Sequence, residues 1–390
     1  MKRKTLQALI VSILACSILI TACGPVEEQP IKIGVQGPMT GEWAYEGEGF
    51  RRAVLLLADD VNARGGLLDG RPVEIVVGDD RGDPEEARRV ARRMAEENVI
   101  AVIGAYNSDA TEVASEVYDT AGILQVTPSS TAIRLTEKGY SCFLRTCFRD
   151  DAQGQFAAEL MLNTLGKQRI ALVHDDTVYA KGLAEWTQHY VQASVSDAAS
   201  ETDPVVLFTA VTPGQRDFTP LLQQLDTAAA DVIYFTGYYP EAGLLLKQMR
   251  ETGLANIQFI GGDAVNSPEF VAIAGTQAAR GALVTSAALI EDLHYPETRE
   301  FVAAYEETYG ERPMSAWTLA AADAFRLIEH AIAETQSTDP AALAEFLHTL
   351  KDFPGITGPI AGYDEKGDRQ GIGIVAYVVT EEGDLVLLQP

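Results

Sequence analysis

The sequence predicts an α/β fold with two units, each a parallel sheet flanked by helices. Three observations support this fold class. The chain has 390 residues, which is enough for two domains at roughly 150 residues each. Short apolar segments typical of buried strands alternate with longer segments of helical periodicity. This alternation starts afresh after residue 150, which indicates a second unit of the same class.

The first unit begins with a strand near Ile31 and contains the clearest helix of the chain. Asp83 is an N-cap residue, Pro84 occupies the first helical position, and apolar residues then recur on one face as far as Met94. Arg64–Gly66 marks the end of an earlier helix. The expected strands are residues 31–35, 73–77, 99–103 and 123–126, with helical stretches at 50–61, 83–94 and 110–121.

The second unit repeats this alternation, with strands at residues 170–174, 205–208, 232–235 and 259–260 and helices at 183–193, 218–228 and 241–251. Strands joined by helical crossovers run parallel and are covered on both faces, and ligands of such folds bind outside their carboxyl ends. The expected binding surface therefore consists of the loops after strands, at residues 37–45, 104–111, 127–131, 175–179, 237–240 and 261–266.

Charge and motifs exclude several function classes. The chain has 30 Lys and Arg against 56 Asp and Glu, a formal charge of -26, which repels phosphate backbones and argues against a nucleic-acid partner. The expected loops are rich in hydroxyls, aromatic rings and glycine, and they lack nucleotide-binding, zinc-protease and serine-hydrolase motifs. We therefore expect a binding protein for a small molecule, without metal or cofactor, rather than an enzyme.

Residues 1–22 are expected to be a secretory signal. Lys2–Lys4 is positively charged, and the apolar stretch Leu6–Ile20 has 15 residues, fewer than the roughly 20 that span a bilayer. Small residues precede Cys23, which resembles the bacterial lipoprotein signal, so Cys23 would be lipidated and anchor the mature chain to a membrane. The alternative is an ordinary signal peptide with an incidental cysteine. Residues 23–30 would form a tether.

Two further cysteines, Cys142 and Cys147, remain in the mature chain after Cys16 leaves with the signal. Outside the cytoplasm a disulfide between them would persist. An extended segment of this length separates the Cα atoms by about 16 Å, whereas a disulfide allows about 7 Å. A bond between them therefore requires a bend, and the sequence leaves the disulfide open. Metal binding is not expected, because no histidine lies nearby.

Four segments of the chain are similar to the branched-chain amino acid binding proteins of ABC transporters. They are Ile33–Gly41, Val61–Gly66, Gly237–Glu241 and Asp364–Asp368. The resemblance runs in order from about Ile31 to the end of the chain, so the chain is identified as a member of this family, which has the type I periplasmic binding protein fold.

The resemblance implies two lobes joined by three hinge crossings, near residues 147–151, 284–288 and 356–364. Lobe 1 would comprise residues 31–149 and 287–357, and lobe 2 residues 150–286 and 358–390. Gly355, Gly358, Pro359 and Gly362 punctuate the third expected crossing, and hinges need only a few such positions.

The resemblance also assigns the contacts to a ligand carboxylate. Ser108 and Thr131 match the family's hydroxyl contacts, and Ser129 lies in the turn that supplies a backbone contact. A zwitterion needs such neutral donors around its carboxylate. Two other roles stay open: Ser108 as a helix N-cap and Thr131 as a turn former.

For the ligand ammonium, the resemblance implies Tyr238 or Tyr239 together with Asp263, where Glu is the more familiar acid. Asp263 stays open as an ordinary turn residue and Tyr179 as a packing residue. The positions that match the family's aromatic wall are Tyr45 and Tyr179, with Trp317 near another.

Three function classes follow. The leading one is an extracytoplasmic lipoprotein, monomeric, that closes on a branched-chain or related amino acid and delivers it to an ABC permease. The second is a sensor or binding protein of the same fold for amides or urea-like ligands. The third, a secreted enzyme of Rossmann type, is disfavoured because the cofactor fingerprint is missing.

Overall fold

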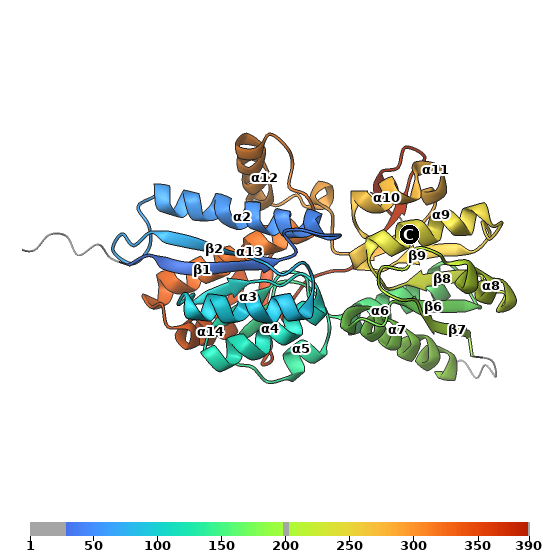
Figure 1. Ribbon diagram of the computed structural model, residues 1–390, viewed down its shortest axis with the longest axis horizontal. Helices are drawn as coiled ribbons and strands as arrows, with labels where there is room; N and C mark the ends of the chain where they lie inside the picture. Colours follow the sequence, from blue (N-terminus) through green and yellow to red (C-terminus); the bar gives the residue numbers. More distant parts are fainter. Residues whose placement is uncertain (1–28, 198–202, 389–390) are drawn as a thin grey trace, which may run out of the picture.

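Two α/β bodies lie side by side in the computed structural model, which describes residues 29–197 and 203–388 (Figure 1). The fold class predicted from the sequence is confirmed. The body that contains the start of the described chain is called lobe 1 below, and the other lobe 2. Cys23 and the expected signal lie outside the described residues.

Lobe 1 is built on a five-stranded parallel sheet. Its strands are β1 (Ile31–Gly37), β2 (Val73–Asp79), β3 (Ala101–Ile103), β4 (Leu124–Thr127) and β5 (Phe143–Arg145), in the order β2-β1-β3-β4-β5. Its helices are α2 (Ala44–Ala63), α3 (Pro84–Glu96), α4 (Ser108–Ala121), α5 (Arg134–Glu137), α12 (Pro296–Tyr309), α13 (Ala316–Thr335) and α14 (Pro340–Thr349).

Alternate residues of this sheet enter two cores, one on each face. Ile33 and Val35 of β1 share a core with residues of α2 and α13. Gly34 faces the opposite side, where a Cβ would lie 2.8 Å from Met94 Sδ of α3, so glycine lets this helix pack closely. Because side chains of a strand alternate between faces, both faces need apolar cover. This requirement explains why the strands of the sequence are continuously apolar instead of alternating with polar residues.

Lobe 2 is built on a seven-stranded sheet. Its strands are β6 (Ile170–His174), β7 (Val205–Ala210), β8 (Val232–Phe235), β9 (Gln258–Gly261), β10 (Leu283–Ser286), β14 (Val375–Val379) and β15 (Leu385–Leu387), in the order β15-β14-β10-β9-β8-β6-β7. β14 and β15 are antiparallel additions at one edge. Its helices are α6 (Asp150–Glu159), α7 (Val178–Asp197), α8 (Thr219–Thr227), α9 (Tyr239–Glu251), α10 (Pro268–Ala274) and α11 (Thr276–Ala279), and a π-helical segment, Leu160–Thr164, continues α6.

Three segments connect the lobes: β5 to α6, β10 to α12, and β13 (Arg369–Gln370) to β14. The third was expected at residues 356–364, and that position is wrong. β12 (Ile360–Tyr363) pairs with β11 (Lys351–Phe353) and with β13 in a three-stranded antiparallel sheet, so the chain crosses only at residues 371–374. Of the glycines that suggested a hinge, Gly355 and Gly358 lie in the turn between β11 and β12, and Gly362 lies within β12.

Cys142 and Cys147 are free thiols, so the disulfide left open by the sequence is not formed. The strand β5 lies between them, and its extended backbone keeps the two side chains apart. Burial raises the pKa of Cys147 to about 12, and its Sγ lies 3.5 Å from the carbonyl oxygen of Ser130. Cys147 therefore behaves as a small core residue.

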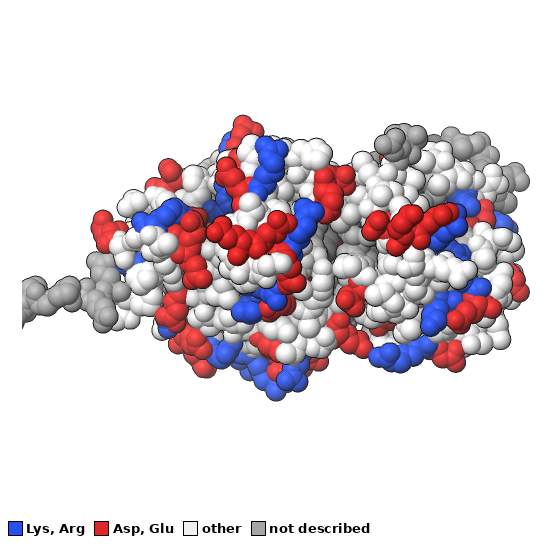
Figure 2. Space-filling model, turned by 90° about the horizontal axis from the view of Figure 1, so that it is seen from above, with Lys and Arg blue, Asp and Glu red and all other residues white. Residues whose placement is uncertain are grey.

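Charged side chains of both signs are spread over the surface of both lobes (Figure 2). Acidic side chains stand on both sides of the boundary between the lobes in this view. Within residues 29–197 and 203–388, no helix is sufficiently long and apolar to cross a membrane.

Candidate ligand-binding site

Six of the eight predicted ligand-binding residues come together between the lobes, at the carboxyl ends of the strands. Lobe 1 supplies hydroxyls after β3 and β4, and lobe 2 supplies aromatic and acidic side chains after β6, β8 and β9. All six are buried: Ser108, Ser129, Thr131, Tyr179, Tyr238 and Asp263. The loop positions expected for a doubly covered parallel sheet therefore do meet in space.

Lobe 1 presents neutral donors. Ser129 Oγ donates a hydrogen bond to the carbonyl of Tyr106 at 3.1 Å, and Ser108 Oγ accepts from the amide of Ala132 at 3.4 Å. The hydroxyl of Thr131 is fully buried and interacts with the carboxyl of Asp150, whose pKa it lowers. Thr131 makes no side-chain bond to the described backbone of lobe 1, so an incoming acceptor would replace Asp150 as its partner.

The amino end of α4 lies at the same place. Ser108 is its first residue, and the preceding Asn107 makes no capping hydrogen bond through its side chain. The first N–H groups of a helix have no partner within the helix, and the helix dipole favours negative charge there. The lobe 1 side of the site is thus suited to a carboxylate. Ser108 is therefore the first residue of the helix and not its N-cap. Its hydroxyl stays a candidate for contact with the ligand.

Lobe 2 presents carboxylates. The hydroxyl of Tyr179 donates to Asp263 Oδ1 at 2.7 Å. Burial raises the pKa of Asp263 to about 6, because desolvation disfavours the charged form. Asp263 is therefore held by Tyr179, Gln153 and the amide of Ala264, and it forms no ion pair among the described residues.

Asp150 is a second acid that sequence reasoning missed. It is the first residue of α6, its side chain is fully buried, and the Thr131 hydroxyl is the side-chain group that its carboxyl interacts with. Burial raises its pKa to about 8, and the nearby charge of Asp263 contributes to the rise. From the sequence, Asp150 is one of two adjacent acids at a helix start, which usually only favours the helix dipole.

Aromatic rings form the wall of the site. The ring of Tyr238 lies 5.4 Å from Tyr179, 5.2 Å from Trp43 and 6.1 Å from Tyr106, measured between centroids. Trp43 and Tyr106 were not predicted, although both lie in loops that were. The wall is therefore more aromatic than the sequence alone indicated.

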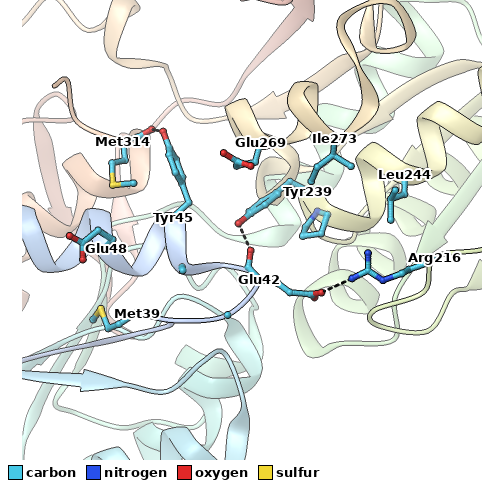
Figure 3. Close-up of a pocket in the computed structure, with 13 residues that line it drawn as sticks. Met39, Glu42, Tyr45, Glu48, Arg216, Tyr239, Leu244, Glu269, Ile273 and Met314 are labelled. Atoms are coloured by element: carbon cyan, nitrogen blue, oxygen red, sulfur yellow. Dashed lines mark hydrogen bonds and ion pairs between the residues drawn. The ribbon is translucent and has the colours of Figure 1, made fainter.

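Tyr45 and Tyr239 lie outside this inner cluster. The hydroxyl of Tyr45 donates to the carbonyl of Met314, and that of Tyr239 donates to the carbonyl of Glu42 at 2.6 Å. Both rings line a groove of about 680 Å³ at one edge of the cleft (Figure 3). Trp317 packs against Phe148, with ring centroids 6.0 Å apart, and lines a different cavity.

The site combines hydroxyl groups from lobe 1 with acidic side chains from lobe 2. Among the described residues, no three His, Cys, Asp or Glu side chains are grouped so that they could hold a metal ion.

A family profile described as periplasmic binding protein matches residues 30–381. The chain belongs to this family. The Leu/Ile/Val-binding protein of Escherichia coli is 33% identical over 360 residues, covering 92% of this chain and 94% of the relative. The leucine-, isoleucine-, valine-, threonine-, and alanine-binding protein of Pseudomonas aeruginosa is 33% identical and covers 89% of each chain.

Solved structures agree with this family. A leucine binding protein from Thermotoga maritima superposes with a TM-score of 0.82 at 28% identity, covering 92% of this chain and 98% of the other. A branched-chain amino acid transporter substrate binding protein from Streptococcus pneumoniae, in complex with isoleucine, gives 0.79 at 27% identity, covering 93% and 100%. The resemblance seen in the sequence is therefore confirmed, as is a ligand-binding role, and the family implies an extracytoplasmic location.

The lobes of this binding protein are closed on each other. The amide of Val178, the first residue of α7 in lobe 2, donates to both carboxylate oxygens of Asp109 in lobe 1 at 3.1 Å. At the other edge, Arg216 pairs with Glu42 at 3.3 Å. These bonds join residues of different lobes, so they require the closed arrangement.

Arg145 positions the loop of this binding protein that carries Thr131. Its guanidinium is fully buried and donates to the carbonyls of Ser130 and Ala132 at 2.8 and 3.1 Å, one on each side of Thr131. Asp368 neutralises it at 2.7 Å and also pairs with Arg149 at 2.6 Å. Asp368, the last residue of the predicted segment Asp364–Asp368, thus holds Arg145 and, through Arg145, the loop that carries Thr131.

Proposed function

We propose that this protein is the lipid-anchored substrate-binding component of an ABC importer, monomeric and without catalytic activity, and that it binds a branched-chain or related amino acid. The observation that carries the ligand class is the division of chemistry between the lobes. Hydroxyls and a helix amino end face the site from lobe 1, and two buried acids face it from lobe 2. This is the polarity of an α-amino acid.

In this proposal the ligand carboxylate accepts hydrogen bonds from Thr131, Ser108 and the turn at Ser129. The ammonium lies between Asp263 and Asp150, with Tyr238 and Tyr179 against it. Tyr45 and Tyr239 take part in closing the cleft rather than in holding the ligand, because their hydroxyls are bonded to backbone carbonyls.

The relatives support the ligand class. The names of two of them state binding of leucine, isoleucine and valine, and one neighbouring structure holds isoleucine. The aromatic wall around Tyr238 offers apolar surface for a side chain. Each lobe makes only part of the contacts, so the ligand favours the closed state.

A thermal-shift panel of the twenty amino acids and small amides tests the ligand class. A ligand at 100 times its dissociation constant adds about 2.7 kcal/mol to the free energy of unfolding, which gives a visible shift. We expect a response to aliphatic amino acids. A response to amides alone would replace the amino acid with an uncharged ligand, and a response to neither would contradict the proposal.

Membrane anchoring is tested at Cys23. We expect the wild-type protein to fractionate with membranes and Cys23→Ser to be released or misprocessed. A freely soluble, unmodified mature wild-type protein would contradict the anchor without affecting the ligand class.

A further inference from the structure

A groove at one edge of the cleft is formed by both lobes (Figure 3). Its apolar lining comes from Met39, Tyr45 and Met314 of lobe 1 and from Tyr239, Leu244 and Ile273 of lobe 2. Its volume of about 680 Å³ lies within the roughly 300–1,000 Å³ of pockets that hold small molecules. None of the six residues assembled at the inner site lines it, so this edge groove is a separate surface.

The two tyrosine rings of the edge groove are held in place. The hydroxyls of Tyr45 and Tyr239 donate to the carbonyls of Met314 and Glu42, so these hydroxyls are already used. What the rings offer a ligand is therefore their π surface, which attracts cations. Met39 and Met314 add thioether side chains, which adapt to apolar groups of irregular shape. The lining thus favours a molecule with apolar groups, and a cation over an anion.

The charges of the edge groove are mainly negative. Three carboxylates and one guanidinium line it: Glu42, Glu48, Glu269 and Arg216. Arg216 pairs with Glu42 at 3.3 Å, and Glu48 pairs with Arg51 of its own helix at 2.6 Å. The carboxylate of Glu269 makes no hydrogen bond or ion pair with the described residues. Because Glu269 is exposed, a ligand in the groove can reach this unpaired charge.

The unpaired carboxylate lies beside the two rings. Figure 3 shows Glu269 between Tyr45 and Tyr239, which belong to different lobes. Burial raises the pKa of both phenols, and the charges of Glu46 and Glu269 add to the rise. The negative charge and both π surfaces are therefore close enough to act on the same bound group. A carboxylate combined with aromatic rings is the environment that stabilises a bulky organic cation.

We propose that the edge groove is a second ligand site, which binds an organic cation of the quaternary ammonium class, with its charge beside Glu269 and its apolar groups against Tyr45 and Tyr239. Since the walls belong to both lobes, occupancy favours the closed state. Closure in turn couples the two sites: the cation raises the affinity of the cleft for its amino acid, and the amino acid raises cation affinity by the same factor. This coupling rests on the function proposed above, whereas the cation site does not.

Titration of the mature protein with benzyltrimethylammonium chloride, followed by NMR, tests this site. The probe has no N–H group, so it cannot donate hydrogen bonds to Asp150 or Asp263 in the inner site. We expect saturable binding with one site per chain. The neutral molecule N,N-dimethylbenzamide, of similar size, should bind at least threefold more weakly. Equal affinity for the amide would overturn the cation preference, and absence of saturable binding would overturn the site.

Two variants locate the bound probe. Glu269→Gln should weaken benzyltrimethylammonium at least threefold, whereas Glu300→Gln, the same change on the exposed surface of α12, should not. Leu244→Lys adds a positive charge to the lining of the groove and should weaken the probe at least as much. Unchanged probe affinity in Glu269→Gln and Leu244→Lys, or an equal loss in Glu300→Gln, would contradict the proposal.

The cleft variant Asp263→Asn separates this proposal from the function proposed above. It should weaken amino acids and leave benzyltrimethylammonium unchanged. Loss of probe binding in Asp263→Asn would place the cation in the inner site and overturn the edge groove. A failed amino acid panel with intact probe binding would overturn only the function.

Small-angle scattering tests closure without any amino acid. Saturating benzyltrimethylammonium should lower the radius of gyration of the ligand-free protein, and it should not do so in Glu269→Gln at the same concentration. An unchanged radius in the saturated wild-type protein would overturn the claim that the cation favours closure.

Discussion

Polar side chains are buried differently on the two sides of the cleft. In lobe 1, Ser108 and Ser129 are hydrogen-bonded to backbone groups, so they stay buried at little cost and remain neutral. In lobe 2, Asp150 and Asp263 are buried and form no ion pair among the described residues, and the pKa of each is raised. An unpaired buried carboxylate is costly. Of the two sides, only that of lobe 2 therefore requires a positively charged group of the ligand.

The comparison also predicts how the ligand is oriented in the cleft. A carboxylate suits the amino end of α4 and the hydroxyl of Thr131, and an ammonium suits the two acids. Neither lobe alone can neutralise both ends of a zwitterion. The predictions below concern four residues and break or sharpen this asymmetry, from the residue with the largest expected effect to the one with the smallest.

The largest effect is expected for Asp263→Asn. Its carboxyl, with a pKa of about 6, is ionised at neutral pH and available to the ammonium. Removing a charged hydrogen bond costs 1.5–3 kcal/mol, or a tenfold to hundredfold loss of affinity. Calorimetry should show this loss for amino acids and little change for a neutral amide. Unchanged amino acid affinity would refute the ammonium assignment.

Asp150→Asn is expected to cost about tenfold near pH 8 and less at lower pH. Burial raises the pKa of Asp150 to about 8, so below pH 8 the wild-type protein must release a proton before it can pair with an ammonium. Wild-type affinity should rise by up to about tenfold in total between pH 6 and 8, because ionisation of Asp150 can add no more than its removal costs. In Asp150→Asn this rise should be largely lost, as measured by calorimetry over that range.

Asp150 should affect the stability of the ligand-free protein in the opposite sense: stability should fall with rising pH, whereas ligand affinity should rise. The folded pKa of Asp150 is about 8 against an ordinary value of 3.8, so folding takes up a proton between these values and stability falls as pH rises through that window. Asp150→Asn should reduce this fall in thermal unfolding without ligand. An equal fall in both proteins would show that Asp150 is not buried unpaired.

Thr131→Val tests the lobe 1 side and should lower amino acid affinity about tenfold, at the lower end of a charged hydrogen bond. The Thr131 hydroxyl interacts with the Asp150 carboxyl, so thermal stability without ligand should fall by about one hydrogen bond, roughly 0.5–1.5 kcal/mol. Ser129→Ala is the matched control, because that hydroxyl already donates to Tyr106. A larger loss for Ser129→Ala than for Thr131→Val would reverse the assignment of the two hydroxyls.

Asp109→Asn should give the smallest effect. Its carboxylate accepts from the first amide of α7 across the cleft, and a charge at a helix amino end contributes about 0.3–1 kcal/mol. Loss of the charge should weaken ligand binding roughly twofold to fivefold and shift small-angle scattering of the ligand-free protein towards a larger radius of gyration. Asp119→Asn, at the exposed end of the same helix, is the control and should change neither.

Much of the fold could be predicted because its signals are local. The Asp83–Pro84 start of α3 is such a case: Asp83 accepts from the amides of Glu85 and Glu86, as the pattern implies. The start of α2 at Ala44, ahead of the expected residue 50, was hidden by Gly47 and Gly49. A Cβ at Gly47 would lie 2.3 Å from the carbonyl oxygen of Pro38, so glycine here reflects close packing rather than a helix end.

Six of the predicted site residues lie in loops after strands and meet in the structure, whereas partners distant in the chain could not be seen in the sequence. Tyr45 and Tyr239 have the right residue type in the right loops, yet their hydroxyls bond to Met314 and Glu42 instead. Asp150 was missed for the reverse reason. Nothing in its local sequence distinguishes an acid that favours a helix dipole from one that is buried without an ion pair.

The sequence by itself determined the alternation of strands and helices, the two units, the family and the loops that form the cleft, because hydrophobic periodicity and turn residues act over a few positions. The tertiary structure alone decided where the chain crosses for the third time, which hydroxyls bond to the backbone and which acids are desolvated. These depend on contacts such as that of Arg145 with Asp368, 2.7 Å apart in space and more than two hundred residues apart in the chain. Burial and partner choice are properties of the packed chain, and they give the acids of lobe 2 their raised pKa values.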